Sequence, residues 1–133
     1  MKNYLSISSI IPSFNKVLDV PGDKSLSIRW VLLASQATGK SKAYNLLESG
    51  DVISAIVSMR KLGVKIIKRR SFYEINGVGL SGFRHKNNLN LNAGNSGTFA
   101  RLLCGTLAGN VKNVNVTGDS SLSKRDFSRV VKP

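Results

Sequence analysis

Hydrophobic residues follow a spacing of two in some segments and of three or four in others, which is typical of alternating strands and helices. The short spacing predicts strands over residues 15–20, 39–47, 64–70, 72–78 and 113–118. The wider spacing predicts helices over residues 24–37, 49–63 and 97–108. This order predicts an α/β fold in which a unit of strand, helix, strand, helix, strand and strand is repeated.

Each predicted helix has a stripe of apolar side chains that we expect to face the core. The stripes are Leu26, Trp30, Leu33 and Ala37 in the first helix, Val52, Ile56 and Met59 in the second, and Phe99, Leu102, Leu103 and Leu107 in the third. The second helix is expected to begin near Asp51 and to stop at Gly63.

A second copy of the repeated unit is under way when the sequence ends. Residues 121–133 begin a helical pattern, and Pro133 follows it with no closing strand. We therefore expect the chain to be a fragment that holds about one and a half repeats.

Composition and charge narrow the class of partner. The 133 residues are 41% hydrophobic, which is enough for the core of one ordinary domain. Lysine and arginine number 20 against 7 acidic residues, a net charge of +13, so an anionic partner is expected: nucleic acid, an anionic membrane, or a phosphorylated or carboxylated molecule. A single cysteine and the lack of an apolar run of roughly 20 residues favour a cytoplasmic protein without internal disulfides.

The segment PGDKS joins a predicted strand to the first predicted helix. Lys24 and Ser25 then lie at the helix N-terminus, where free backbone N–H groups favour an anion. Arg29 lies one turn further along the same face as Ser25. A simpler interpretation is that Asp23 or Ser25 only caps the helix and that both cations face solvent.

Two later segments repeat this arrangement. In NAGNSGTFAR, an N-cap is expected at Asn95 or Ser96, and Thr98 and Arg101 share a face of the helix that follows. In GDSSLSKR, two cations follow a turn of glycine and aspartate after a strand. Three such junctions in one α/β chain are expected at the same edge of the fold, where α/β proteins bind ligands. The sequence therefore predicts an anion site there.

Other motifs fail the requirements of their chemistry. GVGLSG at residues 77–82 resembles a dinucleotide-binding loop, but no helix pattern follows it, and a P-loop sequence is absent. His85 is expected to face solvent and Cys104 to be a small buried residue, and neither supports a metal site. The basic run over residues 65–70 is interpreted as a solvated strand face, with a nucleic-acid surface as the alternative.

Four segments together carry a family resemblance. PGDKSLSIR, NLLESGDV, LNAGNSGTFARLL and TGDSSLSKR, in this order and spacing, resemble the N-terminal part of the 5-enolpyruvylshikimate-3-phosphate synthase family, also called 3-phosphoshikimate 1-carboxyvinyltransferase. The resemblance runs from Val20 to Pro133. The related UDP-N-acetylglucosamine enolpyruvyl transferases differ at PGDKS and are ranked second.

The resemblance implies a fold, a reaction and a cellular setting. The fold is that of the enolpyruvyl transferases, an inside-out α/β barrel of βαβαββ repeats in two domains that close on their substrates. The reaction moves the enolpyruvyl group of phosphoenolpyruvate to the 5-hydroxyl of shikimate 3-phosphate and releases phosphate, in the route to chorismate and aromatic amino acids. No metal or organic cofactor is implied, nor a nucleic-acid or membrane partner, and the full-length protein is expected to be a monomer.

The resemblance also implies a domain assignment. Residues 1–19 would contain a strand that belongs to the other, largely missing domain, and residues 20–133 would form part of the shikimate-3-phosphate-binding domain. The resemblance implies that the acid and base carboxylates lie in the C-terminal part of the family, which this chain lacks. None of the seven acidic residues here could be assigned that work. The isolated chain is therefore expected to be catalytically incomplete.

Roles for the first motif follow from matching positions. By resemblance, Lys24 is a catalytic residue that contacts both substrates and neutralises phosphoenolpyruvate, and Ser25 and Arg29 hold shikimate 3-phosphate. Ile28 departs from the polar residue that is usual before the motif arginine, which predicts the loss of a supporting hydrogen bond.

The second and third motifs supply the rest of the predicted site. By resemblance, Asn95, Gly97 and Thr98 shape the phosphoenolpyruvate pocket, and Arg125 binds phosphoenolpyruvate. Arg101 is expected to support the site without contacting the ligand directly. Asp126 replaces the proline that is common after the motif arginine, and its carboxylate is predicted to compete for Arg125.

Overall fold

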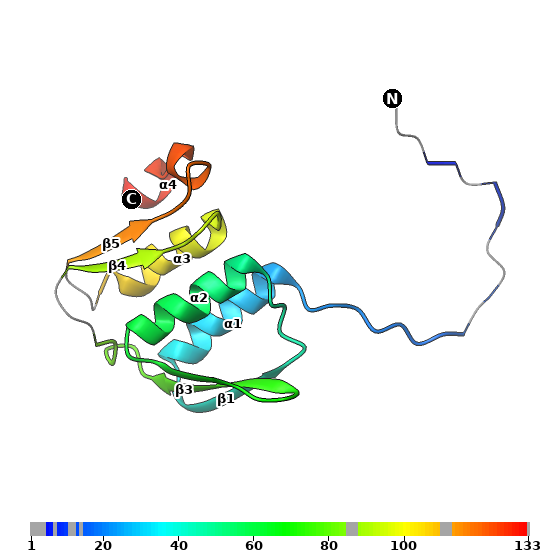
Figure 1. The fold of residues 1–133 in the computed structure, drawn as a ribbon, viewed down its shortest axis with the longest axis horizontal. Coiled ribbons are helices and arrows are strands. Elements are labelled where there is room, and N and C mark those ends of the chain that lie inside the picture. Colours follow the sequence, from blue (N-terminus) through cyan, green and yellow to red (C-terminus); the bar gives the residue numbers. More distant parts are fainter. Residues whose placement is uncertain are drawn as a thin grey trace.

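The computed structural model describes residues 5–6, 8–10, 13, 15–84, 88–109 and 113–132. Its helices are α1 (Lys24–Gln36), α2 (Gly50–Lys61), α3 (Gly97–Leu107), the short 3-10 helix η1 (Leu122–Lys124) and α4 (Ser128–Val131). Its strands are β1 (Thr38–Tyr44), β2 (Lys65–Lys68), β3 (Phe72–Val78), β4 (Leu89–Asn92) and β5 (Val114–Thr117). The helices lie between two small sheets, one below and one above in Figure 1.

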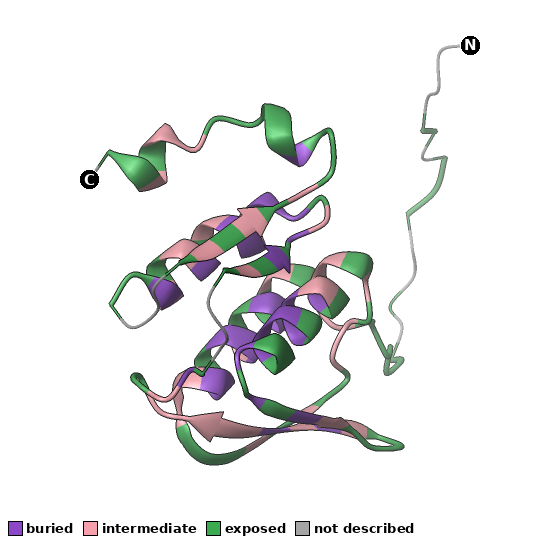
Figure 2. Ribbon diagram, turned by 60° about the vertical axis from the view of Figure 1, so that its left-hand side comes forward, coloured by how far each residue is buried: buried purple, intermediate pink, exposed green. Residues whose placement is uncertain are grey.

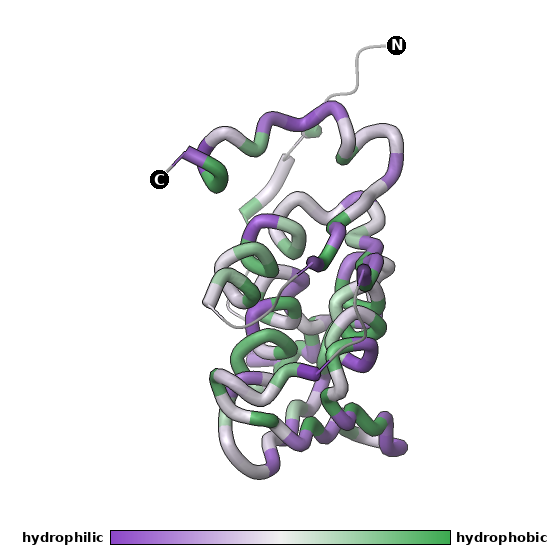
Figure 3. Tube along the Cα trace, turned by 90° about the vertical axis from the view of Figure 1, so that its left-hand side faces the viewer, coloured by the Kyte–Doolittle hydropathy of each residue, from purple (hydrophilic) through white to green (hydrophobic). Residues whose placement is uncertain are grey.

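The first sheet has three antiparallel strands in the order β1-β3-β2. Ile66 of β2 and Ile75 of β3 are register partners, and both are buried against the helices. Hydrophobic and hydrophilic residues follow one another closely along the strands at the lower end of the molecule (Figure 3). This alternation gives the sheet one face toward the core and one toward solvent.

The second sheet pairs β4 and β5 in parallel, with Leu89 opposite Val114 and Asn92 opposite Thr117. Parallel neighbours need a crossover connection, which α3 supplies here. Because both strands run in the same direction, each ends on the side of the molecule where α3 begins. The loops after β4 and β5 are therefore neighbours.

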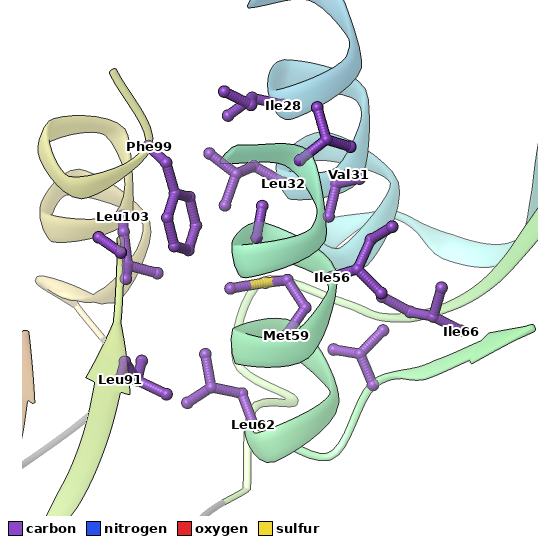
Figure 4. Packing of buried hydrophobic residues seen from close by; sticks show 14 of the residues in the cluster. Ile28, Val31, Leu32, Ile56, Met59, Leu62, Ile66, Leu91, Phe99 and Leu103 are labelled. Carbon is purple, nitrogen blue, oxygen red and sulfur yellow. The ribbon is translucent and has the colours of Figure 1, made fainter. Parts of the chain in front are cut away.

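One hydrophobic core joins the helices to both sheets. Helix α1 contacts α2, α3, β1 and β3, and so lies at the centre of the packing. Figure 4 shows Phe99 and Leu103 pointing from α3 toward Met59 of α2, with Ile28 on α1 close by. All four side chains are fully buried. Figure 2 shows the buried residues concentrated on the helix faces that meet one another.

The apolar stripe predicted for α1 is wrong. Leu26 and Leu33 are 67% and 66% exposed, and Trp30 is only half-buried. The buried face is a different one, formed by Ser27, Ile28, Val31, Leu32, Ala34 and Ser35. Two faces of α1 carry large apolar residues, and the face that contacts α2 and β3 is the one that the fold buries. The buried Ser35 hydroxyl donates to the Val31 carbonyl at 2.6 Å, so the hydroxyl keeps a hydrogen bond inside the core.

The stripes predicted for the other two helices are largely confirmed. Val52, Ile56 and Met59 of α2 are buried. In α3 the predicted Phe99, Leu103 and Leu107 are buried, whereas Leu102 is 37% exposed and lies at the edge of the stripe. On α2 the apolar Ile53 and Val57 lie outside the predicted stripe and are exposed.

One predicted strand does not form, one observed strand was not predicted, and one helix is shorter than expected. Residues 15–20 form no strand and are exposed, because no neighbouring strand among the described residues supplies hydrogen bonds to them. The short strand β4 was missed because its alternating leucine and asparagine residues resemble a polar loop. The helix predicted over 121–133 is divided into η1 and α4, and Pro133 lies outside the described residues.

Candidate functional site

The helices α1, α2 and α3 begin at the same end of the molecule (Figure 1). An open hollow of about 340 Å³ lies there, lined by Lys24, Asp51, Asn95, Ser96, Gly97, Thr98 and Arg125. Each of the three helices contributes residues of its first turn to this lining. Helix N-termini carry free N–H groups and a partial positive charge, so the hollow favours an anion even before its cationic side chains are considered.

Lys24 is the first residue of α1. Asp23 caps this helix by accepting a hydrogen bond from the Leu26 N–H at 2.7 Å, which confirms the simpler interpretation of that aspartate. Lys24 is one of the residues that line the hollow. Its ammonium lies 3.2 Å from the Asp51 carboxylate, and the two side chains are 52% and 22% exposed. An ion pair this exposed contributes about 0–1 kcal/mol to stability.

The start of α3 is held by its own loop. Ser96 is the N-cap and accepts a hydrogen bond from the Phe99 N–H, as the sequence predicted for one of the two candidate residues. Gly94 has a positive φ of 58° and its N–H donates to the Asn92 side chain, so the loop turns sharply out of β4. The turn presents Asn95 and Gly97 to the hollow.

Arg125 reaches the hollow from the end of η1, in the segment that follows β5. Asp119, after β5, accepts a hydrogen bond from the Leu122 N–H, and its own N–H donates to the Gly94 carbonyl at 2.9 Å. This backbone bond ties the loop after β5 to the loop after β4. The Arg125 guanidinium then donates to the Asn95 side-chain oxygen, across 30 positions of sequence.

Arg101 and Asp126 lie beside the hollow and do not line it. The Arg101 guanidinium donates to the Asp126 carbonyl at 3.0 Å and lies over the Phe127 ring, 4.9 Å from its centroid. These contacts hold the chain that follows Arg125, and the supporting role of Arg101 stays a prediction.

The Asp126 carboxylate has a different partner from the one predicted. It accepts hydrogen bonds from the Ser128 N–H at 2.7 Å and the Ser128 hydroxyl at 2.6 Å, at the start of α4. These bonds, together with the nearby charge of Arg101, lower the pKa of Asp126. Among the described residues no ion pair joins Asp126 to Arg125, so the predicted competition is not seen.

Ser25 and Arg29 are not brought into this hollow. Both lie on α1, Ser25 half-buried and Arg29 exposed, and their roles stay predictions. Ile28 is fully buried in the core, so its side chain occupies apolar surroundings and has no need of a hydrogen bond.

The sequence missed Asp51 as a member of the site. Its position at the start of a predicted helix was visible, but its pairing with Lys24 depends on how α1 and α2 pack. Ser96 was recognised only as a cap, although it also lines the hollow. No local pattern gives such neighbours, because the residues come from separate elements.

The remaining sequence predictions concern other parts of the chain. Cys104 is half-buried and lines a largely apolar hollow of about 500 Å³ beside Leu122 and Phe127, so full burial was wrong. Within the described ranges, no three His, Cys, Asp or Glu side chains gather as metal ligands would. His85 lies outside the described residues. No helix in the described part of the chain has the length and apolar character to span a membrane.

Substitution of Gly97 by alanine is expected to weaken anion binding without unfolding the chain. A Cβ at this position would lie 2.8 Å from Arg125 Nη1 and 2.9 Å from Arg101 Nη1, so both guanidiniums must move. The ends of long side chains move cheaply, and alanine favours the helix, so stability is expected to change little. We expect about a tenfold rise in the Kd for inorganic phosphate, or about 1.4 kcal/mol, in an NMR titration.

The matched control is Gly105→Ala in the same helix, where an added Cβ meets nothing within 4 Å. This variant should bind like the original chain. Equal affinity of the Gly97→Ala variant and the original chain would show that the two guanidiniums need no room beside α3.

Comparison with known proteins gives consistent matches. A family model described as EPSP synthase (3-phosphoshikimate 1-carboxyvinyltransferase) matches residues 10–133. The 3-phosphoshikimate 1-carboxyvinyltransferase of a Sulfurihydrogenibium species is 44% identical over 116 residues, covering 87% of this chain and 27% of that protein. That of Oceanobacillus iheyensis is 43% identical over 131 residues, covering 98% and 30%.

A solved structure agrees with these matches. The EPSP synthase from Acinetobacter baumannii superposes with a TM-score of 0.80 at 38% identity, covering 87% of this chain and 26% of that one. The chain therefore spans less than a third of the length of these relatives. Its fold is the enolpyruvyl transferase fold, present in part.

Proposed function

The chain belongs to the EPSP synthase family, and from this premise we propose that it forms part of the site of an enolpyruvyl transferase. The proposed reaction moves the enolpyruvyl group of phosphoenolpyruvate to the 5-hydroxyl of shikimate 3-phosphate and releases phosphate. The observation that carries the proposal is the hollow where Lys24 and Arg125 meet the start of α3. The family match also favours this reaction over that of the UDP-N-acetylglucosamine enolpyruvyl transferases.

The proposed chemistry has two steps. In the first, the 5-hydroxyl oxygen bonds to the central carbon of phosphoenolpyruvate, its proton leaves, and the methylene carbon gains a proton. In the second, the resulting tetrahedral intermediate loses phosphate and a methyl proton, which restores the double bond. Both substrates are polyanions that repel each other in water. An active site for this reaction therefore needs fixed cations that hold the two substrates together.

The hollow supplies those cations for one of the substrates. We assign phosphoenolpyruvate to the space bordered by Lys24, Arg125, Asn95, Gly97 and Thr98. Arg125 is already oriented by its bond to Asn95 and can offer its remaining N–H groups to a phosphate or carboxylate. Gly97 has no Cβ and so leaves room for the guanidiniums of Arg125 and Arg101 beside the backbone of α3.

Shikimate 3-phosphate is assigned to the side of α1 beyond Lys24. There Ser25 and Arg29 follow Lys24 along the first turns of α1. The ammonium of Lys24 would then lie between the two substrates and contact both. In this place the single positive charge of Lys24 offsets the repulsion between the two negatively charged substrates as they approach each other.

The chain supplies only part of the proposed active site. Asp51 is the acidic residue that lines the hollow, and its carboxylate is engaged by Lys24. The groups that transfer protons are therefore expected in the remaining length of the protein. Residues 1–19 are proposed to belong to the other domain and residues 20–133 to the shikimate-3-phosphate-binding domain of a cytoplasmic monomer that needs no metal or organic cofactor.

Two measurements test the proposal. Phosphate release from phosphoenolpyruvate plus shikimate 3-phosphate, with each substrate omitted in turn, should be absent for the isolated chain and present for the complete enzyme. An NMR titration of the chain with phosphoenolpyruvate should shift the backbone amides of residues 24–25 and 95–98. The Arg125→Ala variant should lose these shifts, whereas Arg69→Ala, at an exposed arginine outside the hollow, should keep them.

A different result would favour the nucleic-acid hypothesis. In that case small phosphorylated ligands would not compete, and the logarithm of the affinity for an oligonucleotide would fall linearly with the logarithm of salt concentration. Competition by phosphoenolpyruvate at a saturable site would exclude it.

A further inference from the structure

Asp51 is an acidic residue inside a site built for anions. It is the second residue of α2, and its carboxylate Oδ2 lies 3.2 Å from Lys24 Nζ. The other residues that line the hollow are Lys24, Arg125 and the uncharged Asn95, Ser96, Gly97 and Thr98. Because a carboxylate repels an incoming phosphate, its presence there requires an explanation.

The explanation lies in the surroundings of the Lys24 ammonium. The side chain of Lys24 is a flexible chain of four carbons and is half exposed. Its ammonium can therefore swing out into bulk water. The positive charge of Arg125 and the positive ends of three helices all favour its leaving the hollow. The Asp51 carboxylate attracts the Lys24 ammonium and so opposes this repulsion. The Asp51 carboxylate is itself stabilised, since it lies in the first turn of α2.

We propose that Asp51 is a positioning residue, whose carboxylate holds the Lys24 ammonium in the hollow so that it meets the phosphate or carboxylate group of the ligand. An ammonium has three N–H donors, so one can bond Asp51 while two remain for ligand oxygens. The inference rests on the proposed function, because it assumes that Lys24 binds an anionic substrate.

A competing role for Asp51 predicts the opposite sign. If the Asp51 carboxylate only competed with the ligand for the Lys24 ammonium, its removal would free Lys24 and strengthen anion binding. If it positions Lys24, its removal lets the ammonium leave and weakens binding. The direction of the change therefore decides between the two roles.

The test compares the original chain with Asp51→Asn, Asp51→Glu and the control Glu48→Gln. The control breaks a different ion pair, between Lys68 and Glu48 at 2.7 Å, which lies outside the hollow. Each protein is titrated with phosphoenolpyruvate and with inorganic phosphate, and backbone amide shifts give the Kd. For Asp51→Asn we expect a Kd about tenfold higher than that of the original chain, which corresponds to about 1.4 kcal/mol. Asp51→Glu should partly restore the affinity, and the control should leave the Kd unchanged.

A second readout follows the lysine directly. The N–H signal of the Lys24 ammonium is expected to be protected from exchange with water in the original chain and in Asp51→Glu, and to be lost in Asp51→Asn. A purely structural role of Asp51 would not make the signal of one ammonium depend on a carboxylate. If Asp51→Asn does not fold, Asp51→Ser removes the charge with a residue that suits a helix start.

The outcomes separate this inference from the proposed function. Unchanged or tighter binding by Asp51→Asn, with weaker binding by Arg125→Ala, would overturn the positioning role alone. If Arg125→Ala also bound as the original chain does, the anion site itself would be wrong. Weaker binding by both variants supports the two together.

Discussion

Replacement of Lys24 by alanine is expected to cause the largest loss of function among single changes in the hollow. The ammonium is the charge nearest to the Asp51 carboxylate and is proposed to contact both substrates. A hydrogen bond to a charged group contributes about 1.5–3 kcal/mol, so the Kd for phosphoenolpyruvate should rise about 10- to 100-fold. In the complete enzyme, where the charge also acts on the transition state, turnover should fall by about 10²–10³.

The folded state should tolerate this change. Lys24 is half exposed and its helix is capped by Asp23, so the thermal unfolding temperature is expected to stay close to that of the original chain. Lys68→Ala is the matched control, since Lys68 also forms an ion pair, with Glu48, but outside the hollow. Equal affinity for phosphoenolpyruvate in Lys24→Ala and Lys68→Ala would remove Lys24 from the site.

Replacement of Phe99 by alanine is expected to cause the largest loss of stability. The ring is fully buried and points from α3 toward α2 (Figure 4). Its removal leaves a cavity where α1, α2 and α3 meet, and such changes cost about 3–5 kcal/mol. The total free energy of unfolding of a small domain is about 5–15 kcal/mol, so the change should remove a large fraction of the stability.

The control for this prediction lies on the same helix. Leu102 is 37% exposed, so Leu102→Ala is expected to lower the free energy of unfolding by about 1 kcal/mol or less. Urea unfolding followed by circular dichroism measures both. A similar loss for the two variants would mean that α3 is not anchored through Phe99.

Phe99 also connects stability to function. It follows Gly97 and Thr98 in the first turn of α3, and its N–H donates to the Ser96 cap. Loss of the ring is therefore expected to loosen the part of the backbone that borders the anion site. The hollow depends on the core as well as on its charged side chains.

Much of the site could be predicted because its parts are local. The caps at Asp23 and Ser96 depend on residues within three positions, and the placement of Lys24 at a helix start depends only on where the helix begins. The stripe on α2 was also predicted, and its residues are buried although Ile53 and Val57 of the same helix are exposed.

The failures have a common physical cause. Helix α1 has apolar residues on two faces, and the sequence could not decide that Ile28 and Val31 face the core while Leu26 and Leu33 face solvent. Residues 15–20 have the composition of a strand, but a strand forms only where another backbone supplies hydrogen bonds.

By itself, the sequence determined the order of most helices and strands, the helix starts with their caps and cations, and the family to which the chain belongs. Only the tertiary structure decided which face of α1 is buried, that the start of α2 also borders the hollow, and that Asp51 pairs with Lys24. The first group rests on hydrogen bonds and side-chain spacings within one turn of the backbone. The second rests on packing between elements far apart in the chain, and the free energy that fixes such packing belongs to the whole core.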